Sequence, residues 1–448
     1  MNAQIKTMSP GPRVRMPGVV YPPADKLRRY VDAGCLGRES LIEGFMAAHA
    51  QFAGNLALVG PEGNVTHGEL DDITNRIASA FMDLGLQPLD RVVFQVPNCN
   101  ELLFGWLGCL KAGLIPICTL VSHREREIGY LANHAKARLH FVQGDDAKFD
   151  HVAFARQMQA VAPSLAHIVA ARGPARDGAL SLKALYEAQD PARARARVLA
   201  VERDPFQVVL FQLSGGTTGV PKIIPRFGAE YLYNMRTGRD WFGFRPDDIY
   251  FNPMPIMHNF NMVCCTGPML LAGGAVAITP YLTPESLVGI LRDQKPTWIT
   301  MGGPLLSKIV PAIQGGVVSL QQVRGSITTS GAQKLESMIG GQAFHVFGMT
   351  EGMIIYTHAS HPAPARYETV GQPISPLDRV RILKPGTERV LVATNVLLDE
   401  GLVRLIEQEG VDQISVRSPM AGENPPTAIL RVSTTCGISL IPVPDGSA

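Results

Sequence analysis

The sequence lacks the cysteine patterns that stabilise small secreted domains or bind zinc. Seven cysteines occur in 448 residues, and no two of them stand in a Cys-x-x-Cys spacing. Their number is odd, so they cannot all pair within one chain, and neither a disulfide framework nor a zinc site is indicated. Reduced thiols are typical of a cytoplasmic protein, which is the location that we expect.

Long apolar runs and a strong charge of either sign are also missing. The most apolar later run, Met269–Ile278, is too short to span a bilayer, and the N-terminal residues lack the apolar segment of a signal peptide. The sequence has 41 basic and 39 acidic residues and a net charge of +2, so nucleic acid and a membrane surface are not expected partners. The basic stretch Pro191–Arg197 has no aromatic residues, and we interpret it as a solvated linker or exposed helix rather than an RNA-binding arm.

Hydrophobic residues make up 46% of the sequence, and they alternate between strand and helix patterns. Thr66 and Glu69 form a capping-box pattern before a helical run that Gly85 ends. Nearly all-apolar strands, such as Val92–Val96, then alternate with helices, which is typical of a parallel sheet covered on both faces. A second block of this kind runs from Val208 to about Val346. The sequence therefore predicts an α/β fold of more than one domain.

The strand candidate Val208–Phe211 leads into a loop rich in glycine and hydroxyl residues. Glycines let backbone N–H groups point at an anion, hydroxyls add short donors, and a lysine adds positive charge. Val220 and Pro221 precede the lysine, so the loop is not a Walker A motif, and a nucleophile elbow is absent. In preference to an ordinary surface loop, we predict a phosphate-binding loop whose contacting residues are Ser214, Gly215, Gly216, Thr217, Thr218, Gly219 and Lys222.

Three further segments follow strand candidates: Pro253–Phe260, Ser330–Leu335 and Phe347–Gly352. Together with the loop they resemble the adenylate-forming superfamily of acyl-CoA synthetases, luciferases and peptide-synthetase adenylation domains. The chain is most similar to the aryl-acid AMP ligases of siderophore biosynthesis, which use salicylate or 2,3-dihydroxybenzoate. The resemblance runs from about Val20 to about Leu383. It implies a large N-terminal domain of two helix-covered, mainly parallel sheets with a partial barrel-like β subdomain.

The resemblance also implies a reaction, in which ATP and an aryl acid give aryl-AMP and pyrophosphate. It implies catalytic roles for Thr218, Lys222 and His258, with Mg²⁺ held by Glu351 and Thr218. Besides the loop, it implies nucleotide contacts by Gly331, Ala332, Phe347, Gly348 and Thr350. The implied contacts to the aryl acid come from His258, Asn259, Phe260, Cys264, Ser330, Gly331, Val346 and Ile354. An aryl-carrier protein is the implied acyl acceptor.

Without the resemblance, each of these segments has a plainer interpretation. A Thr-Glu pair after a strand is commonly a helix N-terminus, Ser330–Ala332 would serve as a strand-to-helix turn, and Cys264 would be a packed core thiol. With it, Asn259 is expected to hydrogen-bond a ring hydroxyl ortho to the carboxylate. Cys264 then favours salicylate over 2,3-dihydroxybenzoate, because a thiol is a weak partner for a second hydroxyl.

We expect an α/β subdomain over residues 1–190 and a second over 191–383 that carries the loop and the aryl-acid pocket. Residues 384–448 form an atypical tail in which the family's C-terminal domain, with its hinge and lysine, is not found. The expectation at this point is an aryl-acid AMP ligase whose turnover is impaired by truncation. An acyl-CoA synthetase-like ligase and a non-catalytic, ligand-binding remnant are the alternatives.

Overall fold

The computed structural model describes residues 11–214 and 220–378, together with short strands beyond residue 378. The described part is built around two large sheets. Gly215–Gly219, at the centre of the predicted phosphate loop, lie outside the described residues.

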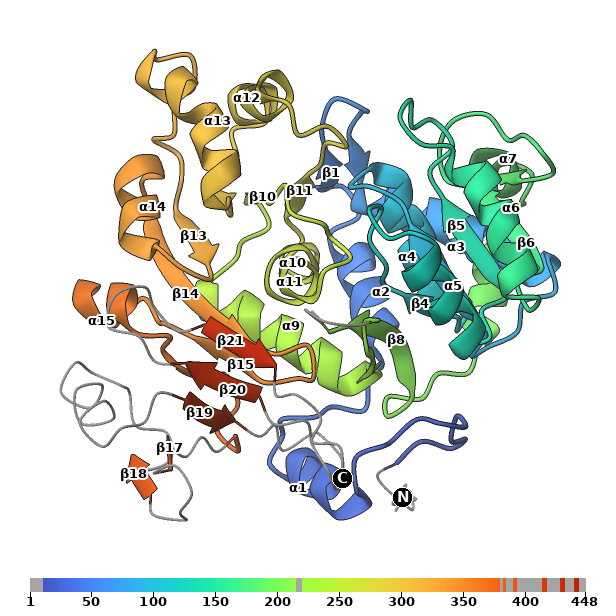
Figure 1. Ribbon diagram of the computed structural model, residues 1–448, viewed down its shortest axis with the longest axis horizontal. Helices are drawn as coiled ribbons and strands as arrows, with labels where there is room; N and C mark the ends of the chain where they lie inside the picture. The colour runs from blue at the N-terminus through green and yellow to red at the C-terminus, as the bar shows by residue number, and fades with distance from the viewer. Residues whose placement is uncertain are drawn as a thin grey trace.

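The first sheet, which lies on the right in Figure 1, has seven strands in the order β7-β6-β5-β3-β4-β8-β9. Its neighbouring strands are parallel except for β8 and β9, which form an antiparallel pair. The strands are β3 (Arg91–Gln95), β4 (Ile115–Ile117), β5 (Leu139–Val142), β6 (His167–Ala170), β7 (Leu180–Ser181), β8 (Val208–Leu213) and β9 (Ile223–Phe227).

The second sheet has nine strands in the order β16-β15-β14-β13-β12-β10-β11-β1-β2. The run from β14 to β1 is parallel, whereas β2, β15 and β16 at its two edges pair antiparallel. The strands are β1 (Leu56–Val59), β2 (Val65–Thr66), β10 (Ile249–Phe251), β11 (Ala275–Ala277), β12 (Trp298–Ile299), β13 (Gly325–Thr328), β14 (Gln342–Gly348), β15 (Ile354–Tyr356) and β16 (Gln372–Pro373).

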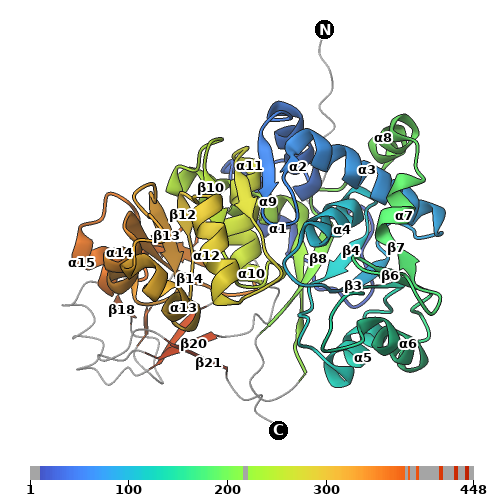
Figure 2. The same cartoon turned by 90° about the horizontal axis from the view of Figure 1, so that it is seen from above.

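Layers of helices alternate with the two sheets (Figure 2). Apolar side chains of α5 and α6 cover the outer face of the first sheet, and those of α12, α13 and α14 cover the outer face of the second. Between the sheets, α2, α3, α4, α9 and α11 share one continuous core with strands of both. The helices are α1 (Ala24–Asp32), α2 (Leu41–Gln51), α3 (His67–Asp83), α4 (Asn100–Lys111), α5 (Glu125–His134), α6 (His151–Val161), α7 (Leu182–Glu187), α8 (Pro191–Ala200), α9 (Gly228–Phe242), α10 (Asn259–Asn261), α11 (Gly267–Leu271), α12 (Pro284–Asp293), α13 (Gly303–Gln314), α14 (Ala332–Ile339) and α15 (Ala363–Glu368).

Local signals in the sequence give the expected elements. At the start of α3 the Thr66 hydroxyl accepts from the Glu69 N–H (3.2 Å), while the Thr66 N–H donates to the Glu69 carboxylate (2.8 Å). Gly85, just past the helix, has φ 80°, the left-handed conformation that glycine adopts most easily. The stretch Pro191–Arg197 belongs to α8, with Asp190 as its N-cap. Of the two interpretations offered for it, a helix is therefore the one observed.

The two sheets do not correspond to the two subdomains expected on either side of residue 190, because each sheet contains strands from both sides. β1 and β2 precede that boundary, yet they complete the second sheet through parallel pairing of β1 with β11. Conversely, β8 and β9 follow the boundary and join the first sheet beside β4. Each exchanged segment pairs with an apolar strand of the sheet that it joins: β1 with β11 and β8 with β4.

Beyond Asp378 the structure describes two small antiparallel sheets. One pairs β17 (Ile382–Leu383) with β18 (Val390–Val392). The other joins β19 (Gln413–Val416), β20 (Ala428–Arg431) and β21 (Ser439–Pro442). The described strands do not close into a barrel. In residues 11–214 and 220–378, no helix has the length and apolar character needed to cross a membrane.

His140 on β5 makes the free energy of unfolding depend on pH. Its ring is fully buried, its Nε2–H donates to the Gln95 side-chain oxygen (3.2 Å), and burial lowers its pKa to about 3. Unfolding returns the pKa to about 6.5, so below that pH the unfolded chain binds an extra proton and stability falls. Between pH 7.5 and 5 the loss from this residue is expected to be about 2 kcal/mol.

Urea denaturation at pH 7.5 and pH 5 measures this loss. We expect His140→Gln, which keeps a donor toward Gln95, to reduce the difference in unfolding free energy between the two pH values. The same substitution of His134, which is exposed on α5, should leave the difference unchanged. Equal pH dependence in both variants would show that His140 is not the titrating group.

Candidate active site

Four of the predicted site segments follow the carboxyl ends of strands. The phosphate loop follows β8 of the first sheet, whereas Pro253–Phe260, Ser330–Leu335 and Met349–Glu351 follow β10, β13 and β14 of the second. Carboxyl ends of parallel strands are where α/β folds bind ligands. The two sheets therefore contribute different groups to one region.

The base of the phosphate loop is closed by its two ends. The Ser214 N–H donates to the Lys222 carbonyl (3.1 Å), and the Lys222 N–H donates to the Ser214 hydroxyl (3.3 Å). The Lys222 side chain is exposed, so its ammonium group is available to an anion. The other predicted loop contacts, Gly215, Gly216, Thr217, Thr218 and Gly219, lie outside the described residues.

The segment after β14 lies beside this base. The Thr350 hydroxyl donates to the carbonyl of Leu213 at 3.5 Å, which brings Glu351 close to the end of β8. Glu351 is partly exposed, and no residue in the described ranges forms a salt bridge with it. Phe347 is buried and Gly348 is exposed. The loop base and the carboxylate thus share one side of the site.

Glu351 fits a magnesium site of the kind that substrate phosphates complete. Three or more acidic, histidine or cysteine side chains do not cluster as a metal site anywhere in the described ranges. Mg²⁺ is commonly bound by one or two carboxylates together with phosphates and water, rather than by an all-protein cage. One accessible carboxylate beside a phosphate loop is what such a site requires.

The segment after β13 turns directly into α14. Gly331 has φ 67°, and no atom lies within 4 Å of the position where a Cβ would be. The Ala332 N–H donates to His345 Nε2 (3.3 Å), and His345 Nδ1 donates to the Thr369 carbonyl (2.9 Å). Ser330 is exposed at this turn. Open space therefore lies beside Gly331. The positive φ of Gly331 is a separate reason why glycine is favoured at this position.

His258 caps α10 and is held as one tautomer. Its Nδ1 accepts from the Phe260 N–H (3.3 Å), so in the neutral ring the proton is on Nε2. The side chain is accessible to solvent, yet burial by the surrounding protein lowers its pKa. A neutral imidazole whose Nε2–H has no hydrogen-bond partner among the described residues suits the binding of a carboxylate oxygen.

Asn259 is buried, and its side-chain oxygen has two partners. Arg226 Nη1 donates to Oδ1 at 3.2 Å, and the Tyr231 hydroxyl donates at 3.0 Å. The same Arg226 Nη1 donates to the carbonyl of Thr350 at 2.8 Å. Arg226 is a site neighbour that was not predicted from the sequence. Its partner Glu230 stands four residues later, but this spacing does not connect Arg226 with Asn259 or Thr350.

Cys264 lies in the core between the sheets. It belongs to a π-helical turn, Met262–Thr266, and burial raises the pKa of its thiol. Val346 pairs with Tyr356 across the β14–β15 hairpin, and Ile354 lies two residues away on the same face. The predicted ring-contacting residues Cys264, Val346 and Ile354 are thereby brought into one apolar cluster.

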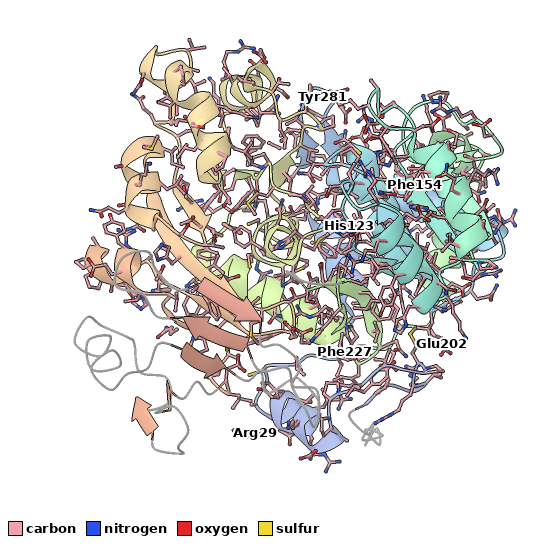
Figure 3. The ribbon with its side chains drawn as sticks, viewed as in Figure 1. Arg29, His123, Phe154, Glu202, Phe227 and Tyr281 are labelled. Carbon is pink, nitrogen blue, oxygen red and sulfur yellow. The ribbon has the colours of Figure 1, made fainter. Side chains whose placement is uncertain are left out.

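A cavity of about 230 Å³ opens between the two sheets at the ends of their strands. One wall comes from Val96–Asn98 and Thr119–Ser122 after β3 and β4, and the other from the segments after β10 and β11. His123 and Tyr281, labelled in Figure 3, are sequence neighbours of the lining residues Ser122 and Pro280. Pro253, Pro255 and Met257 line the cavity, so it is bordered by the segment that leads to His258.

Comparison with known proteins defines the class. The family model for AMP-binding enzymes matches residues 45–396, and the chain belongs to this family. The chain is 31% identical over 408 residues to a salicylyl-CoA synthase / salicylate adenylyltransferase of Streptomyces, covering 87% of this chain and 73% of the relative. It is 32% identical to pyochelin synthase PchD of Pseudomonas aeruginosa (81% and 66%) and 29% identical to 2,3-dihydroxybenzoate-AMP ligase of Bacillus subtilis (81% and 68%).

Solved structures show the same fold. The apo structure of MbtA from Mycobacterium smegmatis superposes with a TM-score of 0.75 at 24% identity, covering 90% of this chain and 71% of that one. The anthranilate CoA ligase AuaEII gives 0.72 at 16% identity, covering 90% and 77%. The predicted fold class and the resemblance to aryl-acid AMP ligases are confirmed. The chain spans about two thirds to three quarters of the length of the relatives it matches.

Proposed function

We propose that this protein catalyses the ATP-dependent adenylation of an aryl carboxylic acid in the cytoplasm, with salicylate preferred and 2,3-dihydroxybenzoate second. The observation that carries the proposal is the meeting of three groups at the strand ends: the loop base with Lys222, the carboxylate of Glu351, and the His258–Asn259 pair. Relatives named as salicylate and 2,3-dihydroxybenzoate ligases support the aryl acid as substrate.

In this reaction a carboxylate oxygen of the acid attacks the α-phosphorus of ATP. A new bond forms between the carboxylate oxygen and the α-phosphorus. The bond between the α-phosphorus and the oxygen that links it to the β-phosphate breaks, and pyrophosphate leaves with that electron pair. His258 Nε2–H would orient the carboxylate, and Lys222 would neutralise charge on the phosphates. Mg²⁺ held by Glu351, and by Thr218 of the loop, would screen the polyphosphate charge when bound.

The preference within aryl acids is assigned to Asn259 and Cys264. Asn259 would hydrogen-bond the hydroxyl ortho to the carboxylate. Cys264, which belongs to the same apolar cluster as Val346 and Ile354, would offer an apolar wall where 2,3-dihydroxybenzoate carries its second hydroxyl. Phe260, Ser330 and Gly331 would complete the contacts to the ring. A thiol accepts and donates hydrogen bonds weakly, so it does not compensate for the loss of water around that hydroxyl.

Aryl-acid-dependent exchange of pyrophosphate into ATP tests the function. We expect exchange with salicylate, weaker exchange with 2,3-dihydroxybenzoate, and little with benzoate. Cys264→Ser should narrow or reverse the preference for salicylate over 2,3-dihydroxybenzoate by roughly five- to tenfold, the effect of one polar contact. Cys265→Ser is the matched control, because the Cys265 thiol faces Asn252 instead. Exchange with straight-chain acids but not with aryl acids would contradict the proposal.

The identity of the acyl acceptor distinguishes an acyl-CoA synthetase from a ligase that loads a carrier protein. Relatives include both CoA synthases and AMP ligases, so thioester formation should be measured with coenzyme A and with an aryl-carrier protein. An aryl-carrier protein is the acceptor that we propose. Binding of ATP and salicylate without any exchange would instead identify the non-catalytic, ligand-binding alternative.

A further inference from the structure

Arg226 is a fully buried cation that none of the proposed reaction steps uses. It lies on β9 directly after the phosphate loop, and its side chain is 1% exposed. Burying a charge is costly unless it is paired and hydrogen-bonded. Glu230 on α9 provides the pairing through contacts with both Nε and Nη2, and Asn234 donates to the same carboxylate at 2.7 Å. The charge is therefore compensated without help from the site.

The remaining donor of Arg226 faces the site. Nη1 donates both to the Thr350 carbonyl (2.8 Å) and to Asn259 Oδ1 (3.2 Å). One rigid guanidinium thus touches the residue before Glu351 and the residue after His258. These two residues are far apart in the sequence, and Arg226 itself follows the loop that carries Lys222. A single side chain connects all three parts of the proposed site.

The surroundings of Asn259 fix which way its amide points. A guanidinium has only donors, so the amide oxygen must face Arg226. The Tyr231 hydroxyl accepts from Gln212 (3.3 Å), and it donates its proton to the same Asn259 oxygen (3.0 Å). Both lone pairs of the oxygen are then used inside the protein. Only the amide NH₂ group remains for a ligand, and it can only donate.

We propose that Arg226 and Tyr231 are positioning residues that make Asn259 an obligate hydrogen-bond donor, and that this selects aryl acids with an ortho oxygen over those with an ortho amine. The inference rests on the proposed function, in which Asn259 faces the ring. An ortho hydroxyl can give its proton to its own carboxylate and still accept from Asn259. The nitrogen of an ortho amine is a poor acceptor, because its lone pair is delocalised into the ring.

The test is the affinity of the full chain for salicylate, benzoate and 2-aminobenzoate, measured by calorimetry with AMP present. We expect the native chain to prefer salicylate to both other acids. Tyr231→Phe and Arg226→Lys each remove or misplace one donor to the Asn259 oxygen. Each should weaken salicylate binding roughly three- to tenfold, the range for one hydrogen bond, and leave benzoate binding within about twofold.

Tyr233→Phe is the matched control, because Tyr233 is on the same helix and donates to the Ile374 carbonyl instead. It should not change the ratio of the affinities. Thermal unfolding of each variant shows whether it folds. If Arg226→Lys does not fold, Tyr231→Phe alone still tests the proposal. Equal weakening of salicylate and benzoate in a folded Tyr231→Phe variant would overturn the positioning role. Native binding of 2-aminobenzoate as tight as that of salicylate would overturn the obligate donor.

A different result would count against the proposed function itself. If the native chain bound salicylate and benzoate equally, Asn259 would not read the ring, whatever the orientation of its amide. If it bound none of the three acids but bound ATP, the aryl-acid assignment would fail. These outcomes differ from the loss of selectivity in the variants alone, so the two proposals are tested separately.

Discussion

Replacing Glu351 with Gln, or Lys222 with Ala, is expected to lower the rate of salicylate-dependent pyrophosphate exchange by about 10²–10³, the usual effect of removing one preorganised charge contact in a protected site. The reasons differ. Lys222 provides positive charge at the phosphates, and its side chain is exposed toward solvent in the ligand-free chain. Glu351 provides a carboxylate beside the loop, and its amide variant keeps the shape but loses the charge.

Calorimetric binding of ATP distinguishes the two residues. Glu351→Gln should weaken binding in the presence of Mg²⁺ more than in its absence, whereas Lys222→Ala should weaken both. Lys183→Ala and Glu187→Gln serve as controls, because these residues form an exposed pair on α7, away from the site. Unchanged ATP·Mg²⁺ binding in both site variants would contradict their assignment.

Arg226→Met is expected to destabilise the protein by about 3–5 kcal/mol, because it leaves the carboxylate of Glu230 buried without its partner. Glu230 is 5% exposed. Of its two side-chain donors in the described ranges, Arg226 and Asn234, only Asn234 would remain after the change. The double variant Arg226→Met/Glu230→Leu should recover much of this loss. Replacing a whole buried ion pair with apolar side chains of similar volume is often neutral or stabilising.

Urea denaturation of the native chain, the single variant and the double variant measures the effect. The double variant separates stability from ligand selection, since it restores the first but still lacks the donor to Asn259. Recovered stability together with recovered preference for salicylate would mean that Arg226 acts on the site only through folding. A double variant as unstable as the single one would show that the ion pair contributes more than an apolar replacement can.

Elements with local signals could be predicted from the sequence, and contacts between distant segments could not. The capping box at Thr66 and the glycine- and hydroxyl-rich loop after β8 are written in consecutive residues. Arg226 contacts Asn259 and Thr350, which stand in other elements, and nothing in the sequence around it announces them. It lies inside a short apolar strand beside Pro225, where an isolated arginine gives no periodic signal.

The order of the strands in the sheets could not be predicted from the sequence for the same reason. The alternation of strands and helices predicts parallel sheets but not which strands are neighbours. Pairing of β1 with β11 places Leu58 opposite Val276, a residue 218 positions later in the chain (276 minus 58). A boundary placed by composition near residue 190 therefore marks a change in the sequence, while the sheets follow the pairing of apolar edges.

The exchange of strands between the two sheets bears on how the chain acquires its fold during synthesis. β1 is made early and can pair at once with β2, but its other edge faces β11, which emerges much later. Likewise, the edge of β4 waits for β8. Contacts of such long sequence separation form slowly, and an open apolar edge is a template for association with another chain. The nascent chain thus carries unpaired edges of two unfinished sheets at once until β8 and β11 have been synthesised.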